Sequence, residues 1–279
     1  MDIYEGIKIV SDIPVSVLSK ERLFKSRGTK CANEKTENGM YAKESFIPLT
    51  PWEPLNNKDV NILVDGEIDW EINNWIGIVV VPEVILDTFN PLRELIKYEK
   101  DMDLIKYKIK NHYSSLVNDV LQHLMRYTDR GPSDIHSAIV HPSTPDLLTT
   151  TKDQDGNLIG MHIDSWYKNT ISERDHAPNR MSINIGLEPR YLLFINQPLM
   201  NINRLLAQEF PDDERRNGVG VGLRTSFMEN YPGYPVIRLE IRPGEAYIAP
   251  TENIIHDGCT MGQNYLDMQL NLRGNFKYP

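Results

Sequence analysis

The sequence predicts a mainly β protein with helical support, and three observations lead to this prediction. About eight short β-rich runs follow Gly131, separated by turn signals such as Pro232-Gly233 and Pro243-Gly244. No long helix is predicted between those runs, which favours an antiparallel sandwich or a small barrel. One long amphipathic pattern precedes them, and 279 residues supply enough side chains for a sizeable core.

The N-terminal half is irregular at first and helical later. Residues 1–60 contain four prolines and a polar stretch, so we expect loops, short strands and a lid there. The apolar run Trp75–Val81 predicts a buried strand, followed by a helix that begins near the next proline. Apolar residues recur every three or four positions in Met102–Tyr127, which predicts one long helix. His112 and His123 belong to that helix, and their separation of 11 residues suits no chelate, so we expect both to be structural.

The second half is predicted to be a series of short strands with one helical insertion. The insertion is Pro198–Phe210. The predicted strands are Ser137–Val140, Leu147–Thr151, Leu158–His162, Met181–Leu187, Tyr191–Asn196, Val236–Ile241, Ala246–Ala249 and Tyr265–Leu272. Because no linker or repeat divides the chain, we expect a single domain over residues 1–279.

Composition excludes several classes of protein. The 30 Lys and Arg against 39 Asp and Glu give a net charge of −9, which disfavours binding to nucleic acid. No apolar run is long enough for a membrane helix and the opening residues lack leader features, so we expect a cytoplasmic protein without a membrane partner. Cys31 and Cys259 lie far apart, which predicts neither a disulfide framework nor a thiolate zinc site.

Arginine is unevenly distributed. Ten of the fifteen arginines follow residue 170, where Lys277 is the only lysine. The guanidinium group binds carboxylates with two parallel hydrogen bonds, so this bias suggests carboxylate ligands. Ion pairing with the acidic residues of the same stretch is the alternative, and for any single arginine it is the favoured explanation.

Two histidines and one aspartate are candidate metal ligands. His162 and Asp164 are separated by one residue, so on a strand their side chains point to the same face. His256 follows a further series of predicted strands. Two imidazoles and one carboxylate leave coordination positions open on a non-haem Fe(II) ion. Each of the three is also compatible with a structural role as a satisfied polar group at a strand end.

With these residues the sequence resembles the Fe(II)/2-oxoglutarate-dependent dioxygenases. The resemblance covers about residues 138–279. It rests on His162 and Asp164, on Pro243-Gly244-Glu245 at the start of the strand that leads to His256, and on a late arginine.

The resemblance implies a fold, cofactors and a partner. The fold is a double-stranded β-helix, or jelly roll, in which residues 137–279 are the catalytic core and residues 1–136 are an irregular and helix-rich support. Fe(II), 2-oxoglutarate and O2 are the implied cofactors, and the implied partner is a small molecule that carries a carboxylate, such as an amino acid or a derivative.

A basic residue holds the far carboxylate of 2-oxoglutarate in such enzymes. Arg273 is our first choice, because the polar residues from Asp267 to Arg273 alternate to one face of the last strand. Arg180, on the strand after the candidate ligands, is the competing choice. The family more often keeps this arginine nearer the distal histidine and places Ser or Thr two residues later, where this chain has Asn275.

A polar and aromatic loop follows the candidate ligands. Loops on a rigid scaffold commonly contact substrates. The substrate-binding candidates are Trp166, Tyr167, Arg174 and Arg224. Related halogenases replace the carboxylate ligand with a small residue, so Asp164 favours hydroxylation or desaturation.

Two other motifs lead to no function. His136 and His141 have no G-x-S-x-G elbow nearby, so hydrolase chemistry has little support. Gly218–Gly222 alternates glycine and valine without the frame of a phosphate loop, and we interpret it as a flexible hairpin or lid.

Two alternatives stay open at this stage. The same three ligands can hold zinc, so a redox-inert metal hydrolase is one alternative. The other is a jelly-roll binding module without catalysis, in which the histidines are structural.

Overall fold

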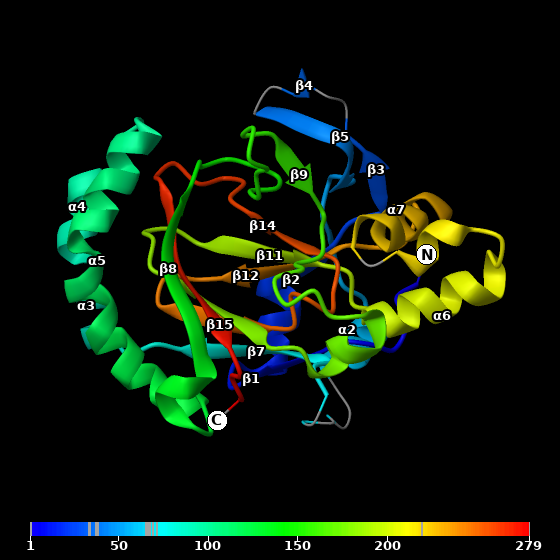
Figure 1. Ribbon diagram of the computed structural model, residues 1–279, viewed down its shortest axis with the longest axis horizontal. Helices are drawn as coiled ribbons and strands as arrows, with labels where there is room; N and C mark the ends of the chain where they lie inside the picture. Colours follow the sequence, from blue (N-terminus) through cyan, green and yellow to red (C-terminus); the bar gives the residue numbers. More distant parts are fainter. Residues whose placement is uncertain are drawn as a thin grey trace.

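Two mainly antiparallel sheets form the centre of the computed structural model, with helices outside both of them (Figure 1). The structure describes residues 2–32, 35–36, 39–64, 68, 70, 72–218 and 220–278, without the side chains of 35–36, 113–116 and 119. Within this part of the chain, no helix is both long and apolar enough to cross a membrane.

The larger sheet has six strands, and only its β1–β7 pair is parallel. In spatial order they are β1 (Lys8–Ser11), β7 (Trp75–Val80), β13 (Glu245–Ala249), β10 (Asn179–Asn184), β15 (Asp267–Gly274) and β8 (Ile135–Ser143). The smaller sheet is antiparallel and contains β14 (His256–Cys259), β11 (Arg190–Phe194), β12 (Ile237–Ile241), β2 (Leu23–Lys25) and β6 (Glu53–Pro54). The N-terminal half therefore extends both sheets, to a greater degree than the sequence suggested.

A third, small sheet lies beside the other two. It contains β3 (Thr29–Cys31), β5 (Gly39–Pro48) and β4 (Lys35–Thr36), and β9 (Leu158–Gly160) pairs with β5 in parallel. Past β9, an isolated bridge joins His162 to His256, so this segment continues onto the edge of the smaller sheet.

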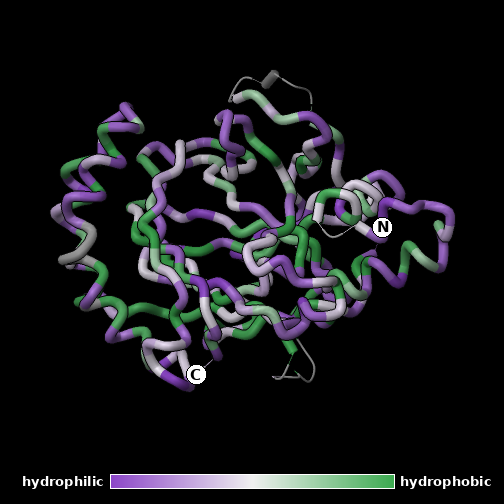
Figure 2. Tube along the Cα trace, viewed as in Figure 1, coloured by the Kyte–Doolittle hydropathy of each residue, from purple (hydrophilic) through white to green (hydrophobic). Residues whose placement is uncertain are grey.

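Helices cover the outer face of each sheet, and the pattern of apolar residues explains why. Beside the larger sheet lie α3 (Glu83–Asp87), α4 (Asn90–Ile96) and α5 (Met102–Leu124), and beside the smaller sheet lie α6 (Leu199–Glu209) and α7 (Val221–Asn230). The remaining helices are α1 (Val15–Val17), α2 (Asn57–Val64), a π-helix at Leu18–Arg22, and 3-10 turns at Met125–Tyr127, Gly131–Asp134, Ile171–His176 and Glu214–Asn217. Hydrophobic and hydrophilic residues alternate along the outer helices and along several of the central strands (Figure 2).

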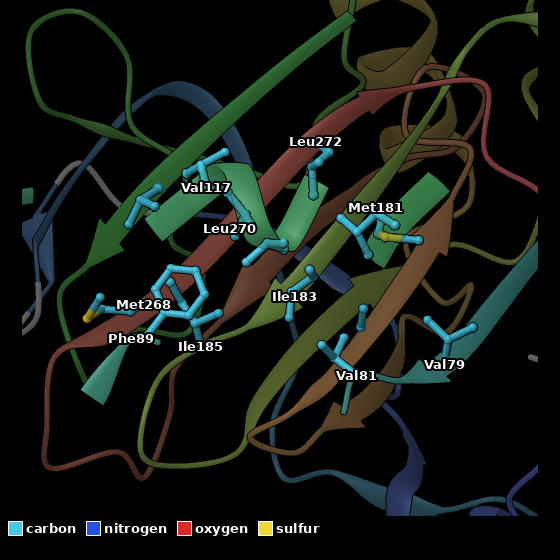
Figure 3. Close-up of a cluster of buried hydrophobic side chains, with 14 of the residues drawn as sticks. Val79, Val81, Phe89, Val117, Met181, Ile183, Ile185, Met268, Leu270 and Leu272 are labelled. Carbon is cyan, nitrogen blue, oxygen red and sulfur yellow. The ribbon is translucent and has the colours of Figure 1, made fainter. Parts of the chain in front are cut away.

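Side chains alternate along the central strands. Those on one face form an apolar core under the helices, and those on the other face point into the space between the two sheets. Met181 and Ile183 of β10 pack with Leu270 and Leu272 of β15 under the helices (Figure 3). A second cluster fills one half of the space between the two sheets, where Tyr247 of β13 meets the β12 side chains. The other half of this space holds polar residues, and the candidate ligands lie there.

Most predicted elements are confirmed. The helix at Met102–Tyr127 is α5 with its terminal turn, and Asp101 caps it by accepting from the N–H groups of Asp103 and Leu104. The side chains of Tyr113 and Leu116, part of the predicted apolar stripe, lie outside the described residues. The insertion Pro198–Phe210 is α6.

Two predicted elements are wrong. Leu147–Thr151 is a loop rather than a strand, because the Asp257 carboxylate accepts the N–H groups of Thr150 and Thr151 in place of a neighbouring strand. The interpretation of Gly218–Gly222 as a hairpin is also wrong for its described part. Gly220, with a φ of 89°, is instead the N-cap residue of α7, and position 219 lies outside the described residues.

Candidate metal centre

The two candidate histidines face each other across an isolated bridge between the segment after β9 and the first residue of β14. The His162 N–H donates to the His256 carbonyl at 2.9 Å, and the His256 N–H donates back at 2.8 Å. Two residues paired in this way project their side chains to the same face, and the ring centroids lie 4.7 Å apart. Before this pair, Gly160 has a φ of 64° and approaches the Phe46 carbonyl so closely that a Cβ atom would collide with it. Only glycine fits where the chain turns toward the ligands.

Asp164 completes the cluster. Its N–H donates to the Thr251 carbonyl at 3.2 Å. Its Oδ1 lies 3.7 Å from His162 Nε2, and its Oδ2 lies 3.7 Å from His256 Nε2. All three ligand atoms lie within 4.8 Å of one another, and all three side chains are buried. Donors that are each about 2.1 Å from one ion stand about 3–4 Å apart, so the cluster is wide enough for a metal ion.

Hydrogen bonds to main-chain carbonyls set the orientation of both rings. His162 Nδ1 lies 2.9 Å from the Gly160 carbonyl, and His256 Nδ1 lies 3.3 Å from the Ile254 carbonyl. A carbonyl can only accept, so when the ring is neutral, as a metal ligand must be, Nδ1 carries the proton and Nε2 presents its lone pair. Metal-binding histidines are commonly oriented by such contacts.

Buried atoms without partners indicate that the cluster suits a cation. His256 Nε2 and Asp164 Oδ2 are buried and have no hydrogen-bond partner among the described residues. Arg180 Nη2 lies 2.6 Å from the same Oδ2, but this ion pair lacks hydrogen-bond geometry, so the oxygen keeps a free lone pair. Imidazole nitrogen and carboxylate oxygen are donors that first-row transition metals accept.

The electrostatics of the cluster agree with this interpretation. Burial opposes charge on His162, but Asp164 and Asp257 outweigh it and raise the pKa of His162 to about 10. Burial, together with the neighbouring charges of His162 and Arg180, lowers the pKa of His256 to about 4 against the opposing effect of Asp164. Burial also disfavours the charged form of Asp164, yet Arg180 and the two histidines hold its pKa well below the ordinary value. In the metal-free protein the cluster therefore favours one positive charge, on the His162 ring between Asp164 and Asp257.

Two further buried charged residues have polar contacts that the sequence did not single out, and one of them, Asp257, faces the cluster. Asp257 is buried, its Oδ2 lies 3.7 Å from His162 Nδ1, and its Oδ1 accepts three bonds from Thr150 and Thr151. Arg190 is 1% exposed and pairs with Asp267 at 3.2 Å, while its Nη1 has no partner among the described residues. No local motif marks either residue, because their roles come from contacts between distant strands.

The two arginines considered for 2-oxoglutarate lie side by side. Arg180 of β10 and Arg273 of β15 are register partners, so both point into the space between the sheets. Arg180 is held by Asp164, as described above. The Arg273 guanidinium lies 3.3 Å from the centroid of the Trp166 ring, and no acceptor among the described residues bonds to it.

The loop after Asp164 is fixed to the turn before β14. Glu252 Oε1 accepts the N–H groups of Trp166 at 2.7 Å and Tyr167 at 3.1 Å. Arg174, predicted to contact substrate, is fully buried. Its guanidinium donates to the main-chain carbonyls of Asp164 and Glu252. Trp166 and Tyr167 are exposed, and the Tyr167 hydroxyl lies 2.6 Å from His136 Nδ1.

Arg224 lies on another side of the cluster. It is one wall of a cavity of about 240 Å³ that is also lined by His162 and Ile163. The structure therefore brings Arg224 close to the candidate ligands, although 60 residues separate it from Asp164 in the sequence.

The chain is similar to solved structures of the Kdo hydroxylase KdoO, a non-heme Fe(II) alphaketoglutarate dependent dioxygenase. The complex with succinate and Fe(III) is 14% identical, the match covers 76% of this chain and 85% of that chain, and the TM-score is 0.38. The complex with alphaketoglutarate and Fe(III) is 15% identical over 76% and 85% of the two chains, with a TM-score of 0.36. The cobalt(II) complex is 15% identical over 75% and 86%, with a TM-score of 0.37. No protein-family model matches the sequence, and no curated protein matches it significantly.

Proposed function

We propose that this protein is a non-haem iron oxygenase. It couples the oxidative decarboxylation of 2-oxoglutarate to hydroxylation or desaturation of a small carboxylate-bearing substrate, such as an amino acid or a derivative. The observation that carries the proposal is the convergence of His162, Asp164 and His256 with their ligand atoms within 4.8 Å. Two imidazoles and one carboxylate hold Fe(II) and leave positions open for a cosubstrate.

The strand order supports a jelly roll as the scaffold. Along the chain, β8 lies in the larger sheet, the segment at His162 joins the smaller one, and β10 returns to the larger. The strands β11 and β12 then lie in the smaller sheet, followed by β13, β14 and β15, which alternate between the two. This alternation brings the segment before β10 next to β14, so residues about 90 positions apart share one site.

Fe(II) and 2-oxoglutarate, when bound, supply the oxidative decarboxylation of the keto acid to succinate and carbon dioxide, coupled to oxygen activation. The residues of the chain bind and orient these groups. Arg273 is our choice for the far carboxylate of 2-oxoglutarate, because its N–H groups have no acceptor among the described residues and because the Trp166 ring supports its guanidinium plane. Arg180 stays the competing choice, and its contact with Asp164 orients that ligand.

The residues proposed for substrate differ in exposure. Trp166 and Tyr167 lie on the exposed loop directly after the ligand Asp164. Arg224 lines the cavity next to His162. Because Arg174 is buried against main-chain carbonyls, we propose that it positions this loop rather than contacting substrate.

Anaerobic spectroscopy tests the function directly. Addition of 2-oxoglutarate to the Fe(II) protein should produce a metal-to-ligand charge-transfer band, and substrate should then stimulate release of succinate. His162→Ala and His256→Ala should each abolish ferrous binding. Tight zinc binding with hydrolysis and no such band would favour a redox-inert hydrolase, and unchanged ferrous binding in both variants would favour a non-catalytic binding module.

A further inference from the structure

The cavity beside His162 carries an inference about the substrate. Its walls come from three distant segments, namely β5, the segment that leads to the metal ligands, and the start of α7. Two cations lie in these walls, Lys43 of β5 and Arg224 of α7. Since His162 is common to the cavity and to the ligand cluster, a molecule in the cavity would lie next to the metal centre.

Arg224 is a buried cation that forms no ion pair among the described residues, and the Glu44 carboxylate acts on it only from a longer distance. Arg224 is 6% exposed, and among the described residues no carboxylate lies within ion-pair distance of it or of Lys43. Its Nη atoms donate to neutral acceptors, the carbonyls of Met161 and Glu44, and its Nε has no partner in the described part of the chain. Buried charges in proteins are normally paired, so this guanidinium lacks an anion.

The backbone around the cavity is arranged to hold this guanidinium. Glu44 has a φ of 61°, in the left-handed region, at the point where the register between β5 and β9 shifts. This irregularity directs the Glu44 carbonyl toward Arg224 Nη2 at 3.0 Å. The side chain is therefore fixed at the cavity wall from two directions.

The N-terminus of α7 adds a second source of positive potential. Gly220 and Val221, its N-cap and first residue, both line the cavity, and no side chain in the described part of the chain caps the helix. The first N–H groups of a helix have no intrahelical acceptor, and the helix dipole favours an anion there. A helix N-terminus and an unpaired guanidinium thus act on the same small volume.

We propose that this cavity binds the oxyanion group, a carboxylate or a phosphate, of the substrate. The guanidinium of Arg224 and the first N–H groups of α7 provide the contacts, and Lys43 lies at the wall as a second cation. This inference rests on the proposed oxygenase function, since it assigns the anion to the molecule that the metal centre oxidises.

Equilibrium dialysis of the full chain, freed of metal by a chelator, tests the anion site without any turnover. The probes are labelled inorganic phosphate and, separately, labelled acetate, and their relative affinities distinguish the two oxyanions. We expect one probe to bind at one site per chain, and Arg224→Met to weaken it by at least about tenfold. Arg204→Met is the matched control, because Arg204 is an exposed arginine on α6 outside the cavity wall.

A second variant decides the question if Arg224→Met fails to fold. Val221 is 63% exposed, and an acidic residue in the first turn suits a helix, so Val221→Asp should fold and repel the anion. Val84→Asp adds the same charge to the first turn of α3 and should bind normally. Absence of binding by the unmodified protein, unchanged binding in Arg224→Met and Val221→Asp, or equal losses in the controls would each overturn the proposal.

The ferrous 2-oxoglutarate band, recorded on the same proteins, separates this inference from the proposed function. Retention of the band without anion binding would overturn only the substrate site. Anion binding that depends on Arg224, without a band in the unmodified protein, would overturn the oxygenase and with it the role of the cavity as a substrate site.

Discussion

The strands β10 and β15 have two faces with different roles, although the residues of the two faces alternate along the same backbone. The outer face lies under the helices, and the inner face lies between the two sheets. Met181 and Leu272 are register partners that pack under the helices in the outer core. Arg180 and Arg273, the next pair, point into the space between the sheets. The outer face shields apolar surface from water, and the inner face surrounds the candidate metal centre.

The two faces differ in the substitutions that each one tolerates. An apolar cluster depends on summed volume, so several side chains share its contribution and similar ones can replace each other. The inner face depends on single atoms, because a ligand nitrogen acts from one fixed position that a side chain of similar volume does not reproduce. Substitutions on the inner face should therefore reduce function with little loss of stability, and those on the outer face should have the opposite effect.

The largest effect is expected for His256→Asn. Turnover should fall by about a thousandfold or more, because a metal centre lowers the barrier by several kcal/mol. The free energy of unfolding should stay within about 1 kcal/mol, because His256 Nε2 has no hydrogen-bond partner among the described residues to lose. Succinate release and urea denaturation measure the two quantities. A large loss of unfolding free energy in His256→Asn would mean that this side chain contributes to packing as the outer core does. It would contradict the proposed difference between the two faces.

Leu270→Ala tests the outer face. Leu270 is fully buried in the cluster under the helices, so the variant should lose about 2–5 kcal/mol of unfolding free energy. Leu270→Met conserves volume and should lose less than about 1.5 kcal/mol. The folded fraction should bind cobalt(II) with the affinity of the unmodified protein, as measured by its absorption spectrum. Weaker cobalt binding by the folded protein would mean that the two faces are coupled.

Arg273→Met tests the inner face beside the metal. Loss of a bidentate, charge-assisted contact should raise the half-saturating concentration of 2-oxoglutarate by about 10–100-fold, with ferrous binding unchanged. Arg238→Met is the control, because Arg238 also stacks on aromatic rings but belongs to β12 of the other sheet. If Arg180→Met gave this effect and Arg273→Met did not, the clamp would be Arg180.

Arg174→Met tests a side chain that supports the site from behind. Arg174 donates to the carbonyls of Asp164 and Glu252, so its loss should loosen a ligand and weaken metal binding by about 10–100-fold. Competition with a chelator measures this affinity. If Arg174→Met bound metal normally but required a higher substrate concentration for half-saturation, Arg174 would be a substrate-binding residue, as the sequence predicted.

Local patterns were sufficient to predict those parts of the molecule in which one segment determines its own structure. The periodicity of Met102–Tyr127 predicted α5, and the alternation from Asp267 to Arg273 predicted one polar face of β15. His162 and Asp164 were identifiable because their spacing already places two ligands on one face. Their meeting with His256 was expected from a resemblance and not from the pattern alone.

The remaining features depend on contacts between segments far apart in the chain. Leu147–Thr151 has the composition of a strand, but the Asp257 carboxylate takes the N–H groups that a neighbouring strand would have bonded. The helix α7 begins at a glycine in a sequence that also suits a hairpin. Glu252 and Arg190 lie in no recognisable motif, and only the folded structure gives them partners.

The smallest effect is expected for a substitution of Asp134, directly before β8. The start of β8 lies beside the end of β15, and we call this place the rim of the larger sheet. The Asp134 carboxylate accepts the backbone N–H groups of Arg130 and Asp129, and its carbonyl accepts from Asn275, two residues after Arg273. The backbone bond from Arg130 is the main cause that lowers the pKa of Asp134 below its ordinary value, aided by the Arg130 side chain against the effect of burial. A lowered pKa means that the ionised form stabilises the folded state.

This stabilisation should be complete above the unfolded pKa of about 4 and should disappear as the pH falls through the lower folded value. Asp134→Asn should therefore lose about 1 kcal/mol of unfolding free energy at neutral pH, and its difference from the unmodified protein should shrink below about pH 4. Urea denaturation at several pH values measures this difference. If the difference in unfolding free energy were independent of pH, the Asp134 side chain would stabilise the rim by its shape and not by its charge. The rim would then resemble the outer face, where packing determines stability.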